Sequence, residues 1–505
     1  MTGITNQIQT PMGAGVQAIL ETAVNTESGL ALTSTDPSVT VGGIFPGSMF
    51  SVWEAASLAA GTYTPVILAN WNNTSNAALQ LMTTLDFGAI TQLNTAYVAS
   101  TVALTSLTAT NLVQASSDFN LSGTGLTTVS LPALKYIGGA LGGSAAVTPT
   151  FSLPALIAVN AGVSPAVNTA ATISMPNLVY VGAAFQFGAS TATSLDFSSL
   201  AYVGGAFTPS FAIATTLNLS SLTFVGGAFN PSMAAITTLT IPNLVTVGGA
   251  ITFTANSLTT FSAPALTSIG GAFSPVSSGM TTLSMPALTT MGIAAGPNSP
   301  NLPALTTLTL TNLVSILGGW SPASIASLTT LSFPALTSVT GTSNNSMTFT
   351  GAAMTTASAP SLVSIQGQLG ANAPLLTTLT LTSLATIGLA LNVASLASLT
   401  TLSLPAIVSI GSLVSMGTVT ALTTFTLGAT LKSIGGNFTC TGAALTQASV
   451  DGILVRLAAL DGTGGTTSYN SKTVNVSGGT SSTPSATGLA AKVTLVSRGC
   501  TVTTN

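Results

Sequence analysis

One 22-residue phrase recurs through most of the chain and constrains its fold more than any other feature. A proline that follows a short apolar-polar alternation stands at Pro242, Pro264 and Pro286, in steps of 22 residues. Earlier copies place this position at Pro176, Pro154, Pro132, Thr110 and Gly88, with Ser198 and Ser220 in between; later copies, in steps of 22 to 26, place it at Thr311, Pro334, Pro360, Thr382, Pro405 and Gly428. These are about sixteen repeats, and a period of 20 to 50 residues is typical of solenoids.

Each repeat carries the pattern of a short strand and a corner. Leu alternates with hydroxyl residues, as in Thr378 to Leu381, which is the period of a half-buried strand. Proline ends the strand because it lacks a ladder donor, and a Gly-Gly pair such as Gly204-Gly205 supplies backbone freedom for a corner. Side chains that recur every 22 residues are predicted to stack on one another inside the core as a ladder, namely Phe185, Phe207, Phe229, Ile251 and Phe273.

Composition excludes several classes of protein. The chain has 505 residues, 46% of them hydrophobic, so it should fold rather than remain disordered. No apolar run reaches the roughly 18 residues of a membrane span, and the N-terminus lacks a secretory signal pattern, so membrane insertion is not expected. With 3% charged residues, no His and a net charge of −3, the sequence predicts no catalytic site, cofactor or metal and no nucleic-acid partner.

The repeated phrase L-x-x-L-x-L-P-x-L-x-x-I-G-G-A-F resembles bacterial leucine-rich repeats of the BspA-like type and the related receptor L-domain repeats. The resemblance covers about residues 83–439, although the recurrent Cys-containing turn of the BspA-like pattern is missing. It implies a leucine-rich-repeat-like β-solenoid. Such repeats occur in adhesins, surface proteins and phage particles alike, so the resemblance specifies fold rather than function.

The two ends of the chain differ from the middle. Residues 1–82 are predicted to form a separate N-terminal docking or capping domain, residues 83–440 the solenoid, and residues 441–505 a small α/β cap. In the cap, apolar residues recur at helical spacing over 448–460, and a second helix is expected near 486–497. Strands are expected at 473–476 and 500–504. This last block is similar to the end module of phage tail and virion-associated proteins.

Hydroxyl residues that flank the inward Leu of each strand form the main candidate binding surface. With Leu239 pointing inward, Thr238 and Thr240 face outward. The full candidate ladder is Thr216, Asn218, Thr238, Thr240, Thr260, Ser262, Thr282, Ser284, Thr307, Thr309, Thr330, Ser332, Thr378, Thr380, Thr401, Ser403, Thr424 and Thr426. A flat Thr-x-Thr array is what ice-binding solenoids display. It also suits glycan or partner recognition, or simply a soluble strand surface.

Few other side chains offer chemistry. A disulfide between Cys440 and Cys500 is left open, because pairing requires proximity that a sequence does not show. Asp196, the only charged residue between Lys135 and Lys432, is predicted to lie on a turn or strand surface. An enzyme would have to gather carboxylates from the ends of the chain, namely Glu21, Glu27, Asp36, Glu54, Asp451 and Asp461.

The sequence therefore predicts a structural protein of a bacteriophage particle: a fibre, spike or decoration subunit at the virion surface. Its N-terminal domain would contact other virion proteins, while the neutral solenoid attaches to a host-surface glycan or protein through many weak contacts. A homo-oligomer is expected because the solenoid ends expose strand edges. The alternative is a bacterial cell-surface or secreted extracellular protein, acting as an adhesin or as an ice-binding protein through the Thr-x-Thr ladder.

Overall fold

The computed structural model describes residues 84–86, 91–93, 97–99, 105–121, 126–143, 150–166, 170–187, 191–211, 213–341 and 347–505. The predicted docking or capping domain at residues 1–82 lies outside these ranges. The described chain is mostly β and forms a β-solenoid of about 14 turns. The repeat predicted about sixteen, a count that includes a segment around Gly88, outside the described residues. The chain divides into two compact units, Met1–Gly249 with Phe253–Leu258, and Ala250–Thr252 with Thr259–Asn505.

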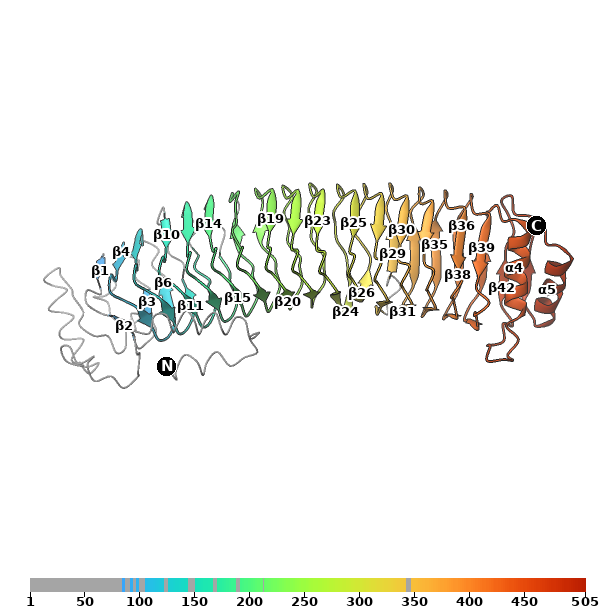
Figure 1. Cartoon of the computed structure of the whole chain (residues 1–505), viewed down its shortest axis with the longest axis horizontal. Coiled ribbons are helices and arrows are strands. Elements are labelled where there is room, and N and C mark those ends of the chain that lie inside the picture. Colours follow the sequence, from blue (N-terminus) through green and yellow to red (C-terminus); the bar gives the residue numbers. More distant parts are fainter. Residues whose placement is uncertain are drawn as a thin grey trace. The chain divides into compact units, whose positions relative to one another are not determined.

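Each coil contributes strands to parallel rows, and within a unit Figure 1 shows the strands of successive coils lying side by side. In the first unit the first row contains β1 (Thr84–Asp86), β4 (Ser106–Thr108), β7 (Thr128–Ser130), β10 (Thr150–Ser152), β12 (Thr172–Ser174), β14 (Ser194–Asp196) and β19 (Thr238–Thr240). The second row contains β2 (Gln92–Leu93), β5 (Gln114–Ala115), β8 (Tyr136–Ile137), β11 (Ala158–Val159), β13 (Tyr180–Val181), β15 (Tyr202–Val203), β17 (Phe224–Val225) and β20 (Thr246–Val247). The remaining strands are β3 (Tyr97–Ala99), β6 (Phe119–Leu121), β9 (Leu141–Gly142), β16 (Ser210–Phe211) and β18 (Ser232–Met233).

The second unit repeats this arrangement, with longer strands mainly in its third row and in β24 and β26. Its first row contains β21 (Thr260–Ser262), β23 (Thr282–Ser284), β25 (Thr307–Thr309), β27 (Thr330–Ser332), β30 (Thr356–Ser358), β33 (Thr378–Thr380), β36 (Thr401–Leu404) and β39 (Thr424–Leu427). The second row contains β22 (Ser268–Ile269), β24 (Thr290–Asn298), β26 (Ser315–Trp320), β28 (Ser338–Val339), β31 (Ser364–Ile365), β34 (Thr386–Ile387), β37 (Ser409–Ile410) and β40 (Ser433–Ile434). The third row contains β29 (Met347–Thr350), β32 (Leu369–Asn372), β35 (Leu391–Ser395), β38 (Val414–Thr418) and β41 (Phe438–Cys440).

The repeat length sets the strand register. In the first unit Phe151 of β10 lies opposite Ile173 of β12, which lies opposite Leu195 of β14, each one repeat further along the chain. All three side chains are buried. Because equivalent residues of successive coils lie opposite one another, an apolar position in the repeat becomes a continuous apolar column in the core.

The predicted internal ladder is confirmed within each unit. The rings of Phe185 and Phe207 stack with centroids 5.2 Å apart, and those of Phe207 and Phe229 with centroids 5.3 Å apart; both pairs are nearly parallel at 7°. In the second unit Ile251 and Phe273 are bridged and fully buried. Because the rings of successive coils stack on one another at the same position in each repeat, they help to fix the distance between the coils.

The Gly-Gly corners are required by a close approach between coils. A Cβ at Gly204 would lie 2.2 Å from the carbonyl oxygen of Gly182, and one at Gly205 would lie 2.6 Å from the backbone nitrogen of Ala184. Neither Gly204 nor Gly205 is among the glycines with positive φ. The sequence interpretation, that these glycines supply unusual backbone freedom, is therefore replaced by one of packing: backbone of the preceding coil occupies the space of a side chain.

An α/β cap follows the last coil of the second unit, as predicted. It consists of α4 (Gln447–Ala458), β42 (Thr473–Asn475), α5 (Ala486–Ser497) and β43 (Thr501–Thr503). The strands β42 and β43 extend the third row beyond β41 in parallel register. The first row ends differently: Ser449 Oγ of α4 accepts from Phe425 N at 2.8 Å and donates to Phe425 O at 3.3 Å. The Ser449 side chain thus takes the place of a further strand and satisfies the exposed backbone edge of β39.

Candidate binding face

The first row of each unit carries the predicted ladder, and its side chains point away from the core. Leu239 between Thr238 and Thr240 is 2% exposed, whereas both threonines are exposed. The same alternation holds in β25, where Leu308 is buried between Thr307 and Thr309. No residue of the ladder falls in the buried class. The sequence thus identified the outward face correctly, and its role in binding stays a prediction.

In the second unit the outward residues of the first row fall into two columns, carried by the paired strands β21–β23, β25–β27–β30–β33 and β36–β39. The first column is entirely threonine: Thr260, Thr282, Thr307, Thr330, Thr356, Thr378, Thr401 and Thr424. The second contains Ser262, Ser284, Thr309, Ser332, Ser358, Thr380, Ser403 and Thr426. Sequence reasoning omitted Thr356 and Ser358, which lie in register with their neighbours in β27 and β33. The coil that carries them belongs to the enlarged step between Pro334 and Pro360, and the alternation within it was the signal that could have placed them.

Register sets the lateral spacing of these hydroxyls. Thr307 lies opposite Thr330, and Thr309 opposite Ser332. Thr401 is paired in the same way with Thr424 of β39, one coil further on. Neighbouring parallel strands are about 4.8 Å apart. Each column is therefore a row of hydroxyls with a repeat of about 4.8 Å.

A second set of threonines, one residue before several of the ladder strands, donates its hydroxyls to backbone of the preceding coil. Thr329 Oγ1 donates to Thr306 O at 3.0 Å, and Thr355 Oγ1 donates to Thr329 O at 3.2 Å. The same bond recurs from Thr377 to Thr355 O and from Thr423 to Thr400 O.

The ladder hydroxyls themselves have no such use. Within the described ranges, their Oγ atoms make no hydrogen bond to another protein group, so they are available to water or a ligand. In the repeat Thr-Thr-Leu-Thr of residues 377–380, the first hydroxyl is therefore structural and the two outward hydroxyls are free to bind.

After β1, whose corresponding position is Asp86, two coils of the first unit depart from the hydroxyl pattern. The second outward position is Asp196 in β14 and Asn218 in the next coil, and the two residues lie opposite each other across a parallel bridge. Asp196 Oδ1 accepts from Ser198 N and Asn218 Oδ1 accepts from Ser220 N, both at 3.1 Å. Asp196 is half-buried and Asn218 is exposed, so the sequence prediction of a strand surface for Asp196 is confirmed.

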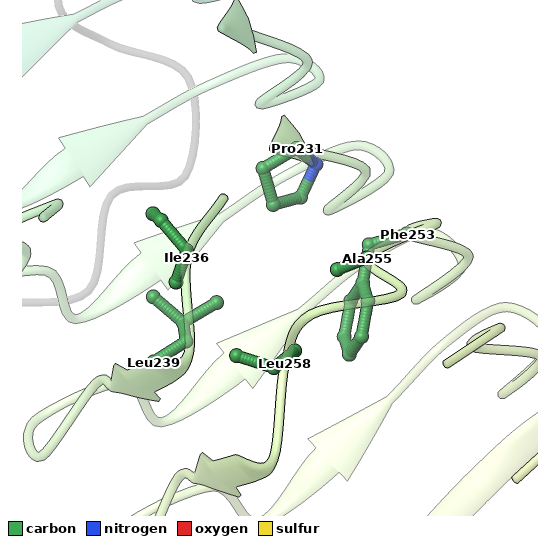
Figure 2. A pocket seen from close by; sticks show the side chains of 6 residues that line it. All are labelled: Pro231, Ile236, Leu239, Phe253, Ala255 and Leu258. Atoms are coloured by element: carbon green, nitrogen blue, oxygen red, sulfur yellow. The ribbon is translucent and has the colours of Figure 1, made fainter. Parts of the chain in front are cut away.

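A small pocket in the first unit carries no polar chemistry. Pro231, Ile236, Leu239, Phe253, Ala255 and Leu258 line it, and Figure 2 shows these side chains gathered between neighbouring coils. All six are buried apolar residues. The pocket is therefore a gap in the packing of the core, without a group that could orient a polar ligand.

The disulfide that the sequence left open is not formed. Cys440 and Cys500 are both free and buried. Cys440 belongs to β41, Cys500 directly precedes β43, and β42 lies between these strands. Two strand spacings are roughly 10 Å, beyond the roughly 7 Å that a bridged pair of Cα atoms tolerates. Burial raises the pKa of the Cys440 thiol to about 12.

Charged side chains of the cap are engaged with backbone. Lys472 Nζ donates to Ile434 O at 2.8 Å and to Gly435 O at 2.9 Å. Arg498 Nη1 donates to Ala458 O at 2.8 Å and Leu460 O at 3.0 Å. These cations add donors to carbonyl groups at the end of the last coil and just after α4, where Leu460 O also accepts from Tyr469 N.

The carboxylates considered for an enzyme are not brought together as an acid-base pair by any contact in the described chain. Asp451 Oδ1 accepts from Ser485 N at 2.9 Å. Asp461 Oδ1 accepts from Thr463 N at 2.8 Å and from its hydroxyl at 2.7 Å, and these bonds lower the Asp461 pKa. The other four candidates, Glu21, Glu27, Asp36 and Glu54, lie outside the described residues.

The described residues contain no group of three or more His, Cys, Asp or Glu side chains that could hold a metal ion. Among the helices of this part of the chain, none has the length and apolar character needed to cross a membrane.

No family model, curated protein or solved structure matches this chain. The likeness to BspA-like repeats and to phage end modules therefore stays a prediction from the sequence.

Proposed function

We propose that this chain is a structural protein of a bacteriophage particle, a fibre, spike or decoration subunit whose solenoid attaches to a host-surface glycan. The observation that carries the binding part is the pair of hydroxyl columns in the second unit, whose Oγ atoms bond to no other group within the described part of the chain. Hydroxyls both donate and accept, as the hydroxyls of a sugar do. The virion setting rests on the sequence resemblance of residues 441–505.

Binding would be multivalent. A single exposed hydroxyl contributes little net affinity, because each bond to a ligand replaces a bond to water. A rigid column with a repeat of about 4.8 Å presents many such groups to one extended polymer, so that weak contacts add through effective concentration. The absence of charge between residues 197 and 431 suits a neutral ligand.

Substitutions on the face test the binding part. Replacing Thr307, Thr330 and Thr356 together by Val keeps shape and strand propensity but removes three hydroxyls, and retention on immobilised neutral polysaccharide should fall. Replacement by Ser keeps the hydroxyls and should preserve retention. A matched control is Thr355→Val, in the column whose hydroxyl bonds the preceding coil. Equal retention of the Val triple variant and the original chain would refute a role for these hydroxyls.

Immunogold electron microscopy tests the virion part. An antibody against the solenoid is applied to a source culture containing cells and released particles. Label at defined positions on particles is expected. Label confined to cell envelopes would refute the virion assignment and favour the adhesin.

A second candidate, ice binding, is favoured by one observation: the first column of the second unit is threonine in every coil, so methyl and hydroxyl groups repeat together. An ice-binding face needs this regularity, whereas a glycan-binding face tolerates serine. Measurement of ice recrystallisation in the presence of the chain decides: inhibition that the Ser triple variant loses would support ice binding, and no inhibition would exclude it.

A further inference from the structure

We propose that Asp196 and Asn218 form a specific subsite for a neutral glycan with two adjacent hydroxyls, on the first-row face of the first unit. The inference rests on the proposed glycan-binding function and deepens it. The hydroxyl columns would supply general affinity, and this pair would fix where along the face a sugar residue is held.

The two side chains are held in the same way. They lie opposite each other on neighbouring parallel strands, whose backbones are about 4.8 Å apart. In each residue Oδ1 accepts the backbone N–H two residues further on, at 3.1 Å. This turn fixes the side-chain plane and leaves the other terminal atom, Oδ2 of Asp196 and Nδ2 of Asn218, without a protein partner among the described residues.

The residue two positions further on permits this turn in both coils. Ser198 and Ser220 occupy the position that proline holds at Pro176 before them and Pro242 after them. Proline has no N–H and could not donate to a side chain two residues earlier. Serine in place of proline therefore makes the turn possible at Asp196 and Asn218, although the coils of Thr311 and Thr382, which also lack proline here, keep a threonine two positions earlier.

The free atoms match a pair of sugar hydroxyls. A carboxylate oxygen only accepts and an amide nitrogen only donates, so one sugar hydroxyl donates to Asp196 and its neighbour accepts from Asn218. Ser174, opposite Asp196 in β12, and the exposed Thr216 add hydroxyls at the rim.

Charge selects the class of glycan. Asp196 is the only charged residue between Lys135 and Lys432, so this stretch of the chain provides no cation for an anionic polymer. A carboxylate would repel such a polymer, whereas hydrogen bonds from a neutral sugar to an ionised group are among the stronger ones. The ligand is therefore a neutral polysaccharide.

The chain supplies its own matched variants. Asp196→Asn keeps an oxygen that accepts from Ser198 N, as Asn218 does from Ser220 N, and removes only the charge and the acceptor. Asn218→Asp likewise keeps its turn and removes the donor. If Asp196 and Asn218 only shape the corner, both variants will bind as the original chain does.

The experiment measures binding of the full chain to sensor surfaces carrying dextran, mannan or galactan, with thermal unfolding as a check of folding. We expect the original chain to bind at least one of these polymers and each variant to bind it about tenfold more weakly. The Val triple variant of Thr307, Thr330 and Thr356 is measured beside them. Unchanged affinity of Asp196→Asn and Asn218→Asp, with loss in the Val triple variant, overturns the subsite and leaves the proposed function standing. No binding of the original chain to any of the three polymers overturns both.

Discussion

Asn298 at the end of β24 gives the sharpest test of how the second unit is held together. This side chain is fully buried and lies where the pairing of β24 with β26 shifts register between Gly292 and Pro297. Its Oδ1 accepts from Phe273 N at 2.8 Å, and its Nδ2 donates to Gly319 O at 2.8 Å. A single amide thereby bridges the coils before and after its own, where the strand ladder is interrupted.

Asn298→Ala removes both bonds and leaves a buried N–H and a buried C=O without partners. Each such group costs about 1–3 kcal/mol, so we expect a loss of about 4 kcal/mol in the free energy of unfolding. For a unit of this size, that loss lowers the unfolding midpoint by about 8–16 °C if the unit unfolds cooperatively.

Hydrogen exchange of individual amides tests the mechanism as well as the magnitude. The Phe273 amide should lose protection in Asn298→Ala. Asn298→Asp keeps the acceptor for Phe273 N but places a carboxylate against Gly319 O. Burial and the facing carbonyl raise the pKa of the introduced carboxyl, so the variant should be more stable near pH 3 than at pH 7 relative to the original chain. Unchanged protection of Phe273 in the Ala variant would refute the bridging role.

Three further perturbations have defined outcomes. The Ser449→Ala variant should lose about 2–4 kcal/mol of unfolding free energy, because Phe425 N and O at the end of the first row lose their partner inside the cap. Chemical denaturation measures this loss. A loss below about 0.5 kcal/mol, the error of such a measurement, would contradict the role of Ser449. Gly204→Ala should destabilise by more than about 2 kcal/mol since its Cβ meets backbone, whereas Gly296→Ala, with open space around it, should change stability by less than about 1 kcal/mol. The thiols of Cys440 and Cys500 should both react with a thiol reagent only after unfolding, and a mass change on reduction would disprove their free state. Because the Cys440 pKa is raised to about 12, its contribution to stability is complete below about pH 9 and is lost as the pH rises towards 12, which alkaline denaturation would show.

Much of the candidate face could be predicted from sequence because the information is local and repeated. Alternation placed Thr238 and Thr240 outside and Leu239 inside, and the 22-residue step aligned Phe185 with Phe207. Both inferences need only the period of a strand and the length of a coil.

Other parts of the face depended on atoms from a different coil. The threonines of residues 377–380 look alike in sequence, yet only Thr377 donates its hydroxyl to the preceding coil. The pairing of Asp196 with Asn218 likewise followed from the parallel register. Sequence reasoning singled out Asp196 by its charge, but it had no signal that this side chain and its neighbour share one turn geometry.

The sequence alone determined the class of fold, the length of the coil and which side of each strand faces the core, since periodicity is a property of neighbouring residues. The tertiary structure decided which hydroxyls are consumed, why Gly204 has no side chain, how Asn298 bridges coils and why Cys440 and Cys500 stay apart. These outcomes depend on distances of a few ångströms between residues 20 or more positions apart. Such distances are set by the stacking of coils and by nothing within a single repeat.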